Sequence, residues 1–171
     1  MTTRDLFIVR HAKSDWSQAI TKDFDRPLNK RGEKDAPLIA HWLDNQNHKP
    51  QIIISSPAQR AKQTANVIVN QLKIPQQNIF FDNRLYLAST ETLIDVLSNI
   101  EADIAAAMLI GHNPGLENLI IHLCGNPLPY EHDAKLLTTA NVVQLRFNSS
   151  WKVLSPKQGN LVNFIRPEDL Y

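Results

Sequence analysis

Short, uninterrupted apolar runs along the chain predict strands that are buried on both faces. The clearest runs cover Leu6–Val9, Ile52–Ser55 and Ala107–Ile110. Apolar residues at successive positions, rather than at every second one, are typical of parallel strands covered by helices on both sides. The pattern therefore predicts a parallel sheet at the centre of the molecule.

Three more apolar runs follow at short spacing near the end of the sequence: Val142–Phe147, Trp151–Ser155 and Leu161–Ile165. Runs of this length and spacing predict further strands. We expect the last two of these strands to pair in antiparallel fashion at an edge of the sheet.

Helical patterns fill the connections between the strands, over residues 29–45, 57–72, 91–101 and 114–123. Pro37 predicts a kink in the first helix or its division into two pieces. We expect Ser56 and Asn113 to cap the second and fourth helices, and Gly125 to end the fourth. Alternating strands and helices predict a three-layer α/β/α fold with a mostly parallel sheet. A length of 171 residues predicts one domain covering residues 1–171.

Basic side chains follow three of the predicted strands. Arg10 and His11 come directly after the first, Arg60 falls in the first helical turn after the second, and His112 follows the third. Ligands of open α/β sheets bind outside the carboxyl ends of the strands. Helix N-termini at the same place favour anions. The sequence therefore predicts a pocket of phosphate size, lined by two guanidinium groups and two imidazoles.

The overall charge narrows the classes of partner. With 18 Lys and Arg against 17 Asp and Glu, the formal net charge is +1, which argues against a nucleic-acid binder that works by bulk charge. No apolar run approaches the roughly 20 residues that a membrane span needs, and the polar N-terminus does not resemble a signal peptide. Cys124 is the one cysteine, so no internal disulfide is expected and a cytoplasmic location is predicted.

The remaining histidines and tryptophans carry no motif of their own. His41, His48, His122 and His132 lack a spacing typical of metal ligands, so no metal or other cofactor is predicted. We interpret the three tryptophans as packing residues, although Trp16 is close enough in sequence to the predicted pocket to affect access to it.

Three motifs in this order resemble the histidine phosphatase superfamily, also called the phosphoglycerate-mutase-like family. They read RHAKS (residues 10–14), SSPAQRAKQTA (residues 55–65) and GHNPG (residues 111–115). The longer segments RHAKSDW and GHNPGLENL are most similar to those of the SixA-type phosphohistidine phosphatases of that family. The resemblance extends from Leu6 to about Pro167, includes RPLNKRG (residues 26–32), and implies a phosphoglycerate mutase-like fold.

The resemblance implies a role for each basic residue of the predicted pocket. His11 would be the nucleophile that becomes phosphohistidine and is then hydrolysed by water, while Arg10, Arg60 and His112 would bind the phosphoryl oxygens. Guanidinium groups match phosphate geometry, and they favour an unprotonated, nucleophilic His11. Three further residues are expected at the edge of the pocket: Lys13, Ser14 and Ser17.

Two positions depart from the family pattern. Ala12 stands where the family usually has a glycine. Mutase-like relatives place a glutamate, which protonates an alcohol leaving group, in the region that here holds Tyr86 and Leu87. Asp82 and Glu91 are the nearest carboxylates, and neither they nor Tyr86 can be assigned as the general acid from the sequence. An imidazole leaves far more readily than an alcohol, so this departure favours a phosphohistidine substrate over a sugar phosphate.

The length of the chain between Arg84 and Met108, 23 residues (85–107), also limits the pocket. It accommodates one helix with its turns and leaves no room for the helical insertion that covers the site in sugar-phosphate enzymes of the family. We therefore expect an open, shallow pocket.

The first prediction for the substrate is a phosphohistidine on a phosphotransfer or signalling protein. A small phosphate ester, or a non-catalytic module that binds phosphoproteins, remains as an alternative, and the oligomeric state is left open.

Overall fold

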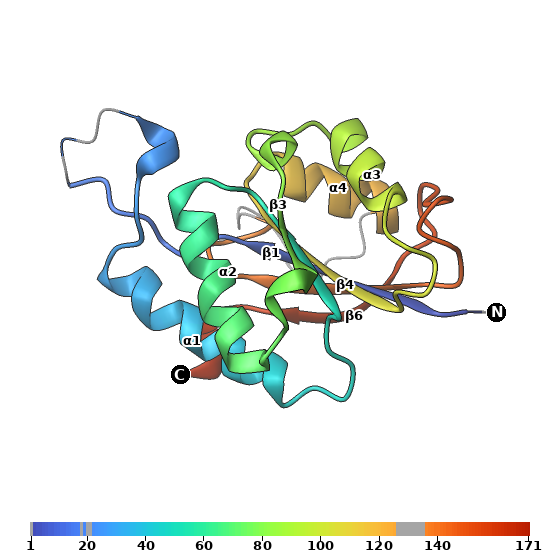
Figure 1. Cartoon of the computed structure of the whole chain (residues 1–171), viewed down its shortest axis with the longest axis horizontal. Coiled ribbons are helices and arrows are strands. Elements are labelled where there is room, and N and C mark those ends of the chain that lie inside the picture. Colours follow the sequence, from blue (N-terminus) through green and yellow to red (C-terminus); the bar gives the residue numbers. More distant parts are fainter. Residues whose placement is uncertain (1, 18, 20–21, 126–135) are drawn as a thin grey trace.

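A sheet of six strands forms the centre of the molecule (Figure 1). The computed structural model describes residues 2–17, 19, 22–125 and 136–171. The strand order is β3-β2-β4-β1-β5-β6. Of the strands in these ranges, only β5 runs against the others, because it pairs antiparallel with both β1 and β6. The strands are β1 (Arg4–Arg10), β2 (Ile52–Ser55), β3 (Ile79–Phe81), β4 (Ala106–Gly111), β5 (Val142–Phe147) and β6 (Asn160–Ile165).

Four α-helices cover the two faces of the sheet: α1 (Lys30–Asp44), α2 (Gln59–Leu72), α3 (Thr90–Ser98) and α4 (Gly115–Cys124). Leu6 and Ile8 of β1 belong to the buried cluster that α3 and α4 complete, whereas Phe7 and Val9 belong to the cluster of α1 and α2. Because a strand points successive side chains to opposite faces, both layers need apolar residues from β1. The α/β/α layering predicted from the continuous apolar runs is confirmed.

Two predictions about strands are wrong. Residues 151–155 form turns and irregular structure, because Trp151 and Leu154 are buried in the core and the Trp151 indole N–H donates to the carbonyl oxygen of Ile104 over 2.7 Å. The antiparallel edge pair is therefore β5 with β6. The three-residue edge strand β3 was not predicted, since it is too short to show a pattern.

The helix boundaries differ in detail from the prediction. α1 runs unbroken through Pro37 rather than as two pieces. α2 begins at Gln59, and Ser56 Oγ accepts from the backbone N–H of Ala58, just before the helix. Asn113 does not cap α4, because Pro114 occupies the N-cap position and the Oδ1 of Asn113 accepts no hydrogen bond from the described residues. The predicted end of α4 at Gly125, in the left-handed region with φ 76°, is confirmed.

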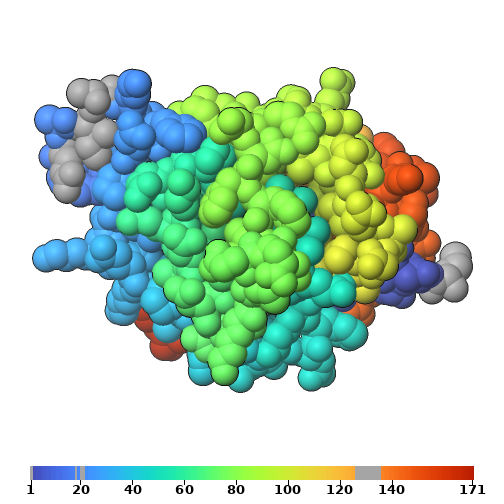
Figure 2. Space-filling view, in the orientation of Figure 1, coloured from blue at the N-terminus to red at the C-terminus, as the bar shows by residue number. Residues whose placement is uncertain are grey.

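Short 3₁₀ helices complete the description: η1 (Asp23–Asp25), η2 (Gln76–Asn78), η3 (Asn83–Leu85) and η4 (Pro167–Leu170). In the space-filling view, the segment that follows β1, drawn in blue, forms one end of the molecule (Figure 2). No helix in the ranges described is long and apolar enough to cross a membrane.

Candidate active site

The residues that follow β1, β2 and β4 meet at one edge of the sheet. β4 lies between the other two strands, with Gly111 in register with Arg10 and Ile110 in register with Ser55. His11 and His112 thus emerge side by side, with ring centroids 5.0 Å apart. The carboxyl ends of parallel neighbours therefore bring the two imidazoles together, as the topology requires.

A cavity of about 240 Å³ opens at this edge. Six of the seven predicted site residues line it: Arg10, His11, Lys13, Ser14, Arg60 and His112. Ser17 does not, because both its backbone N–H and its hydroxyl bond to the Asp15 carboxylate outside the cavity, over 2.8 and 2.6 Å. The geometry thus brings the four principal residues together and leaves Ser17 aside.

His11 is oriented by a bond to the backbone. Its Nδ1 lies 2.8 Å from the carbonyl oxygen of Ala12, and because a carbonyl only accepts, Nδ1 carries the proton. Nε2 therefore keeps its lone pair. Burial lowers the pKa of His11 well below 6.5, against the effect of the Ala12 bond, and the charges of Arg60 and Arg10 lower it further. His11 is thus a neutral imidazole at pH 7 with Nε2 as its basic atom.

Arg60 joins the two histidines. Its Nε donates to His11 Nε2 over 3.2 Å, and its Nη2 donates to His112 Nδ1 over 3.3 Å. The side chain leaves from the second residue of α2, in the first turn as predicted. Thr64 fixes this turn, since its hydroxyl donates to the Arg60 carbonyl and accepts from the backbone N–H of Ala12. The helix is therefore tied to the segment that holds the nucleophile candidate.

His112 is also neutral in the free site. Its Nδ1 accepts from Arg60, so Nε2 carries the proton and donates to Ser56 Oγ over 2.8 Å. Burial lowers the pKa of His112 to about 4, with the charge of Arg60 acting in the same direction. The edge of Tyr86 packs against the imidazole with ring centroids 5.4 Å apart. His112 is consequently held from three sides.

Arg10 reaches the cavity from the end of β1. Its Nη1 donates to the carbonyl oxygen of Leu137 over 3.0 Å, and that carbonyl also accepts from the amide of Asn113 over 2.8 Å. The Nε of Arg10 is buried and has no hydrogen-bond partner within the part of the chain that the structure describes. An unpaired buried donor is costly, so an anion that accepts from it is favoured in this position.

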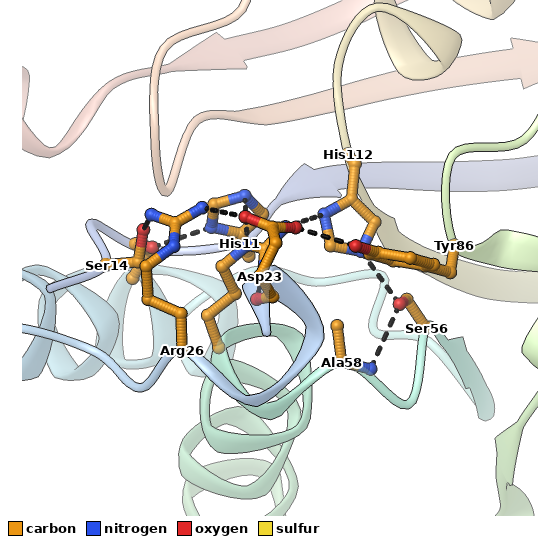
Figure 3. A network of polar contacts seen from close by, with 10 residues as sticks. His11, Ser14, Asp23, Arg26, Ser56, Ala58, Tyr86 and His112 are labelled. Atoms are coloured by element: carbon orange, nitrogen blue, oxygen red, sulfur yellow. Dashed lines mark hydrogen bonds and ion pairs between the residues drawn. The ribbon is translucent and has the colours of Figure 1, made fainter. Parts of the chain in front are cut away.

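Asp23 supplies the negative charge of the site (Figure 3). One carboxylate oxygen accepts from Arg26 over 2.6 Å, and the other accepts from Arg60 over 3.0 Å and from the Tyr86 hydroxyl over 2.7 Å. Arg60 also donates to the Asp23 carbonyl over 2.7 Å. Burial opposes ionisation, but the bonds from Tyr86, Arg26 and Arg60 outweigh it and hold the pKa of Asp23 well below its ordinary value.

The carboxylates considered from the sequence lie elsewhere. Asp82 pairs with Arg84 over 2.8 Å, and Glu91 is exposed in the first turn of α3. Neither lines the cavity. Tyr86 does reach the site, as the donor to Asp23. Among the lining residues that the structure describes, Asp23 is the only acidic one, and it was missed because it stands in the long connection after β1 with no motif around it.

Known proteins resemble the chain in sequence as well as in fold. The model of the histidine phosphatase superfamily (branch 1) matches residues 6–85. An uncharacterized chloroplastic protein of Arabidopsis thaliana is 32% identical over 159 residues, which are 88% of this chain and 70% of that protein. The chain belongs to the histidine phosphatase superfamily. Phosphohistidine phosphatase SixA of Escherichia coli is a more distant relative, 24% identical over 85% of this chain and 86% of its own.

Solved structures of superfamily members share the whole architecture. A candidate SixA from Agrobacterium tumefaciens superposes with a TM-score of 0.79 at 26% identity, covering 98% of this chain and 99% of its own. A candidate SixA from Nakamurella multipartitia gives a TM-score of 0.82 at 19% identity, with 98% of each chain covered. The predicted phosphoglycerate mutase-like fold is confirmed, and the superfamily supports assignment of the chain as a phosphatase.

Cys124 and the remaining histidines that the structure describes are absent from the lining of the cavity. Cys124 is partly buried, its thiol donates to the Ile120 carbonyl over 3.0 Å, and burial raises its pKa. Within the described ranges, no three His, Cys, Asp or Glu side chains are grouped as metal ligands would be. His132 lies outside those ranges.

Proposed function

We propose that the chain is a metal-independent phosphohistidine phosphatase that dephosphorylates a phosphotransfer or signalling protein through a phosphohistidine on its own His11. One observation supports this most strongly: the neutral His11, whose Nε2 is unprotonated and accepts from Arg60, lines the same cavity as the guanidinium groups of Arg10 and Arg60. Phosphoryl transfer depends on in-line positioning and charge neutralisation, and these groups supply both.

In the first step, Nε2 of His11 attacks the phosphorus atom. Arg60 turns its Nε away from Nε2 and donates instead to the phosphoryl oxygens, together with Arg10. His112 takes up a proton from solvent at Nδ1 when the dianion is bound and donates from that nitrogen. The bond from phosphorus to the substrate imidazole breaks, and its electron pair stays on that imidazole nitrogen, which takes a proton from solvent. His11 now carries the phosphoryl group.

In the second step, water hydrolyses the phosphohistidine. The water oxygen bonds to phosphorus, and the Nε2–P bond of His11 breaks with its electron pair returning to Nε2. Asp23 is ionised and lies near Nε2 of His11, since the guanidinium group of Arg60 donates to both of them. Because its pKa lies well below the ordinary value, Asp23 is a weak base. It orients the attacking water by accepting a hydrogen bond, and the water proton passes to solvent, to which 44% of the Asp23 side chain is exposed.

The nature of the leaving group supports phosphohistidine as the substrate. The region where mutase-like relatives carry their acid holds Tyr86, whose hydroxyl donates to Asp23, and Leu87. An alcohol must be protonated in order to leave. An imidazole, with a conjugate-acid pKa of about 6.5, leaves far more readily. A site with an ionised carboxylate and no protonated one suits the easier leaving group.

The test compares turnover of a phosphohistidine-bearing protein with turnover of a panel of phosphate monoesters. We expect the phosphohistidine protein to be preferred, and an acid-labile, alkali-stable phosphoryl group to form on the wild-type chain and on His41→Ala, an exposed histidine of α1, but not on His11→Ala. Faster turnover of monoesters would assign the chain to the small-molecule phosphatases. Phosphate binding without any phosphoenzyme would identify a binding module instead. The cytoplasmic location and the single domain over residues 1–171 stay predictions.

A further inference from the structure

Two large apolar side chains stand exposed at the mouth of the active-site cavity. Trp16 is 73% exposed and Leu87 is 66% exposed, and both line the same cavity as His11. Among the large apolar residues that the structure describes, no others are as exposed as these two. The interpretation of Trp16 as a packing residue is therefore wrong. The two side chains come from segments far apart in sequence, one after β1 and one after η3.

Trp16 is held in place although it is not buried. The guanidinium carbon of Arg26 lies 3.5 Å from the centre of the indole ring. Arg26 is itself fixed, because it donates to the Asp23 carboxylate and to the Ser14 hydroxyl. A cation–π contact of this kind contributes about 0.5–1 kcal/mol at an exposed site. The ring therefore presents an oriented apolar face to solvent beside the phosphoryl-binding groups.

Leu87 keeps its exposed position at a conformational cost. Its φ of 55° lies in the left-handed region, where a side chain with a Cβ is disfavoured by about 1–2 kcal/mol. Next to it, Tyr86 is fixed by Asp23 and by the edge contact with His112. Burial of the leucine within the chain does not offset this cost. Strain of this kind persists where the surroundings impose it, and it is concentrated at sites that bind ligands.

We propose that Trp16 and Leu87 form a docking rim that packs against apolar side chains surrounding the phosphohistidine of a folded partner protein. The proposal rests on the proposed function and deepens it. A cavity of about 240 Å³ is smaller than the roughly 300–1,000 Å³ of pockets that enclose drug-sized ligands, so it admits a phosphorylated side chain and leaves the exposed faces of Trp16 and Leu87 to the protein surface around that side chain. Exposed tryptophans are enriched among the residues that dominate binding energy in protein interfaces. The rim thus recognises the protein, and the cavity recognises its phosphoryl group.

The experiment measures kcat/KM of the wild-type chain, Trp16→Ala and Leu87→Ala on two substrates, a phosphohistidine-bearing protein and the free amino acid phosphohistidine. The quantity of interest is kcat/KM for the phosphohistidine-bearing protein divided by kcat/KM for the free amino acid phosphohistidine. We expect each variant to lower this ratio about tenfold, mainly through a higher KM for the protein, which corresponds to about 1.4 kcal/mol of lost binding. Phe81→Ala is the matched control, because Phe81 is also exposed, also lies near a cation (Lys62), and is absent from the lining of this cavity.

The outcomes separate failure of the rim from failure of the proposed function. An unchanged ratio, with either no loss or an equal loss on both substrates, overturns the docking rim while leaving the phosphatase intact. A wild-type chain that hydrolyses neither phosphohistidine substrate overturns the proposed function and the rim with it. A monomer formed by Trp16→Ala from a wild-type dimer, seen by sedimentation, shows that the rim binds a second copy and also overturns the proposal. Melting curves of each variant confirm that it is folded.

Discussion

Arg60 donates a hydrogen bond to Nε2 of His11, so the proposed nucleophile and the principal anion-binding residue are bonded to each other in the free protein. The same guanidinium group bonds to the Asp23 carboxylate and to a nitrogen of His112. In the proposed mechanism, an entering phosphoryl group replaces the contact between Arg60 and His11. Because Asp23 accepts from the other nitrogen atoms of the guanidinium group, Arg60 is already positioned for that anion.

Replacing Arg60 by lysine should sharply lower activity although the positive charge is kept. A lysine offers one ammonium group in place of a planar fork and cannot contact His11, Asp23 and His112 together. We expect kcat/KM to fall about 10²-fold or more, the usual loss when a preorganised donor is removed. Arg31→Lys, an exposed position paired with Glu168, serves as the control. A loss of only about threefold for Arg60→Lys would contradict the assigned role.

Replacing Asp23 by asparagine should slow the second chemical step more than the first. The amide has nearly the same shape but, without a negative charge, is a weaker hydrogen-bond acceptor for the attacking water, so hydrolysis of the phosphoenzyme should slow by about 10–100-fold. Rapid-quench measurements should then show phosphoenzyme accumulating during turnover. Asp15→Asn, a carboxylate outside the cavity, should behave as the wild type. Equal slowing of formation and breakdown in Asp23→Asn would instead indicate a purely structural role.

The free energy of unfolding should fall as the pH drops below about 6.5. The pKa of His112 is lowered to about 4 and that of His11 lies well below 6.5, both mainly because of burial. Between about pH 4 and pH 6.5, these histidines bind protons in the unfolded chain but stay unprotonated in the native state. Their contribution to the free energy of unfolding is therefore fully present above pH 6.5 and is lost as the pH falls. Each histidine contributes a slope of up to about 1.4 kcal/mol per pH unit.

Urea unfolding at a series of pH values measures this slope. His112→Asn should show a shallower decline than the wild type between about pH 6.5 and pH 4.5, because one of the two buried imidazoles is absent. Identical slopes for the two proteins would mean that His112 is protonated equally in the native and unfolded states.

Gly32 should not tolerate a side chain. A Cβ at this position would lie 2.1 Å from the carbonyl oxygen of Lys13, which is backbone of the segment that follows His11. We expect Gly32→Ala to lower the free energy of unfolding by about 1–3 kcal/mol, as overpacking does, and to reduce activity by displacing that segment. At Gly111, a Cβ would meet only ordinary contacts, 3.5 Å from a Leu116 methyl carbon. Denaturation of Gly111→Ala alongside is the control, and equal losses would contradict the steric argument.

The four principal site residues could be predicted because parallel topology does most of the positioning. Once strands β1, β2 and β4 are recognised as neighbours, whatever follows them meets at one edge, and Arg10, His11, Arg60 and His112 follow them directly or within a turn. The apolar runs of these strands are long enough to be read from the sequence. Local pattern and global arrangement agree here, so a few residues specify the site.

Asp23 and Trp16 show where such reasoning ends. Both belong to the connection between β1 and α1, which is held by the contact of Asp23 with Arg60 of α2 and by the contact between its own residues Trp16 and Arg26, not by any periodicity. Trp151 illustrates the opposite error, because an apolar stretch that looks like a strand is used to fill the core from a turn. Residues of irregular segments that make such contacts follow no regular spacing, so the sequence shows no pattern from which the contacts could be predicted.

The position of β1 in the middle of the sheet has a consequence for synthesis of the chain. It is made before both of its neighbours, β4 and β5, which follow it by about a hundred or more residues. Until they emerge, the apolar stretch Leu6–Val9 has two open edges, and the helices α3 and α4 that cover its Leu6 and Ile8 face are not complete, which is a condition under which nascent chains associate wrongly. Assistance on the ribosome would therefore act chiefly on β1, the strand that ends at Arg10 and leads directly into His11 of the candidate site.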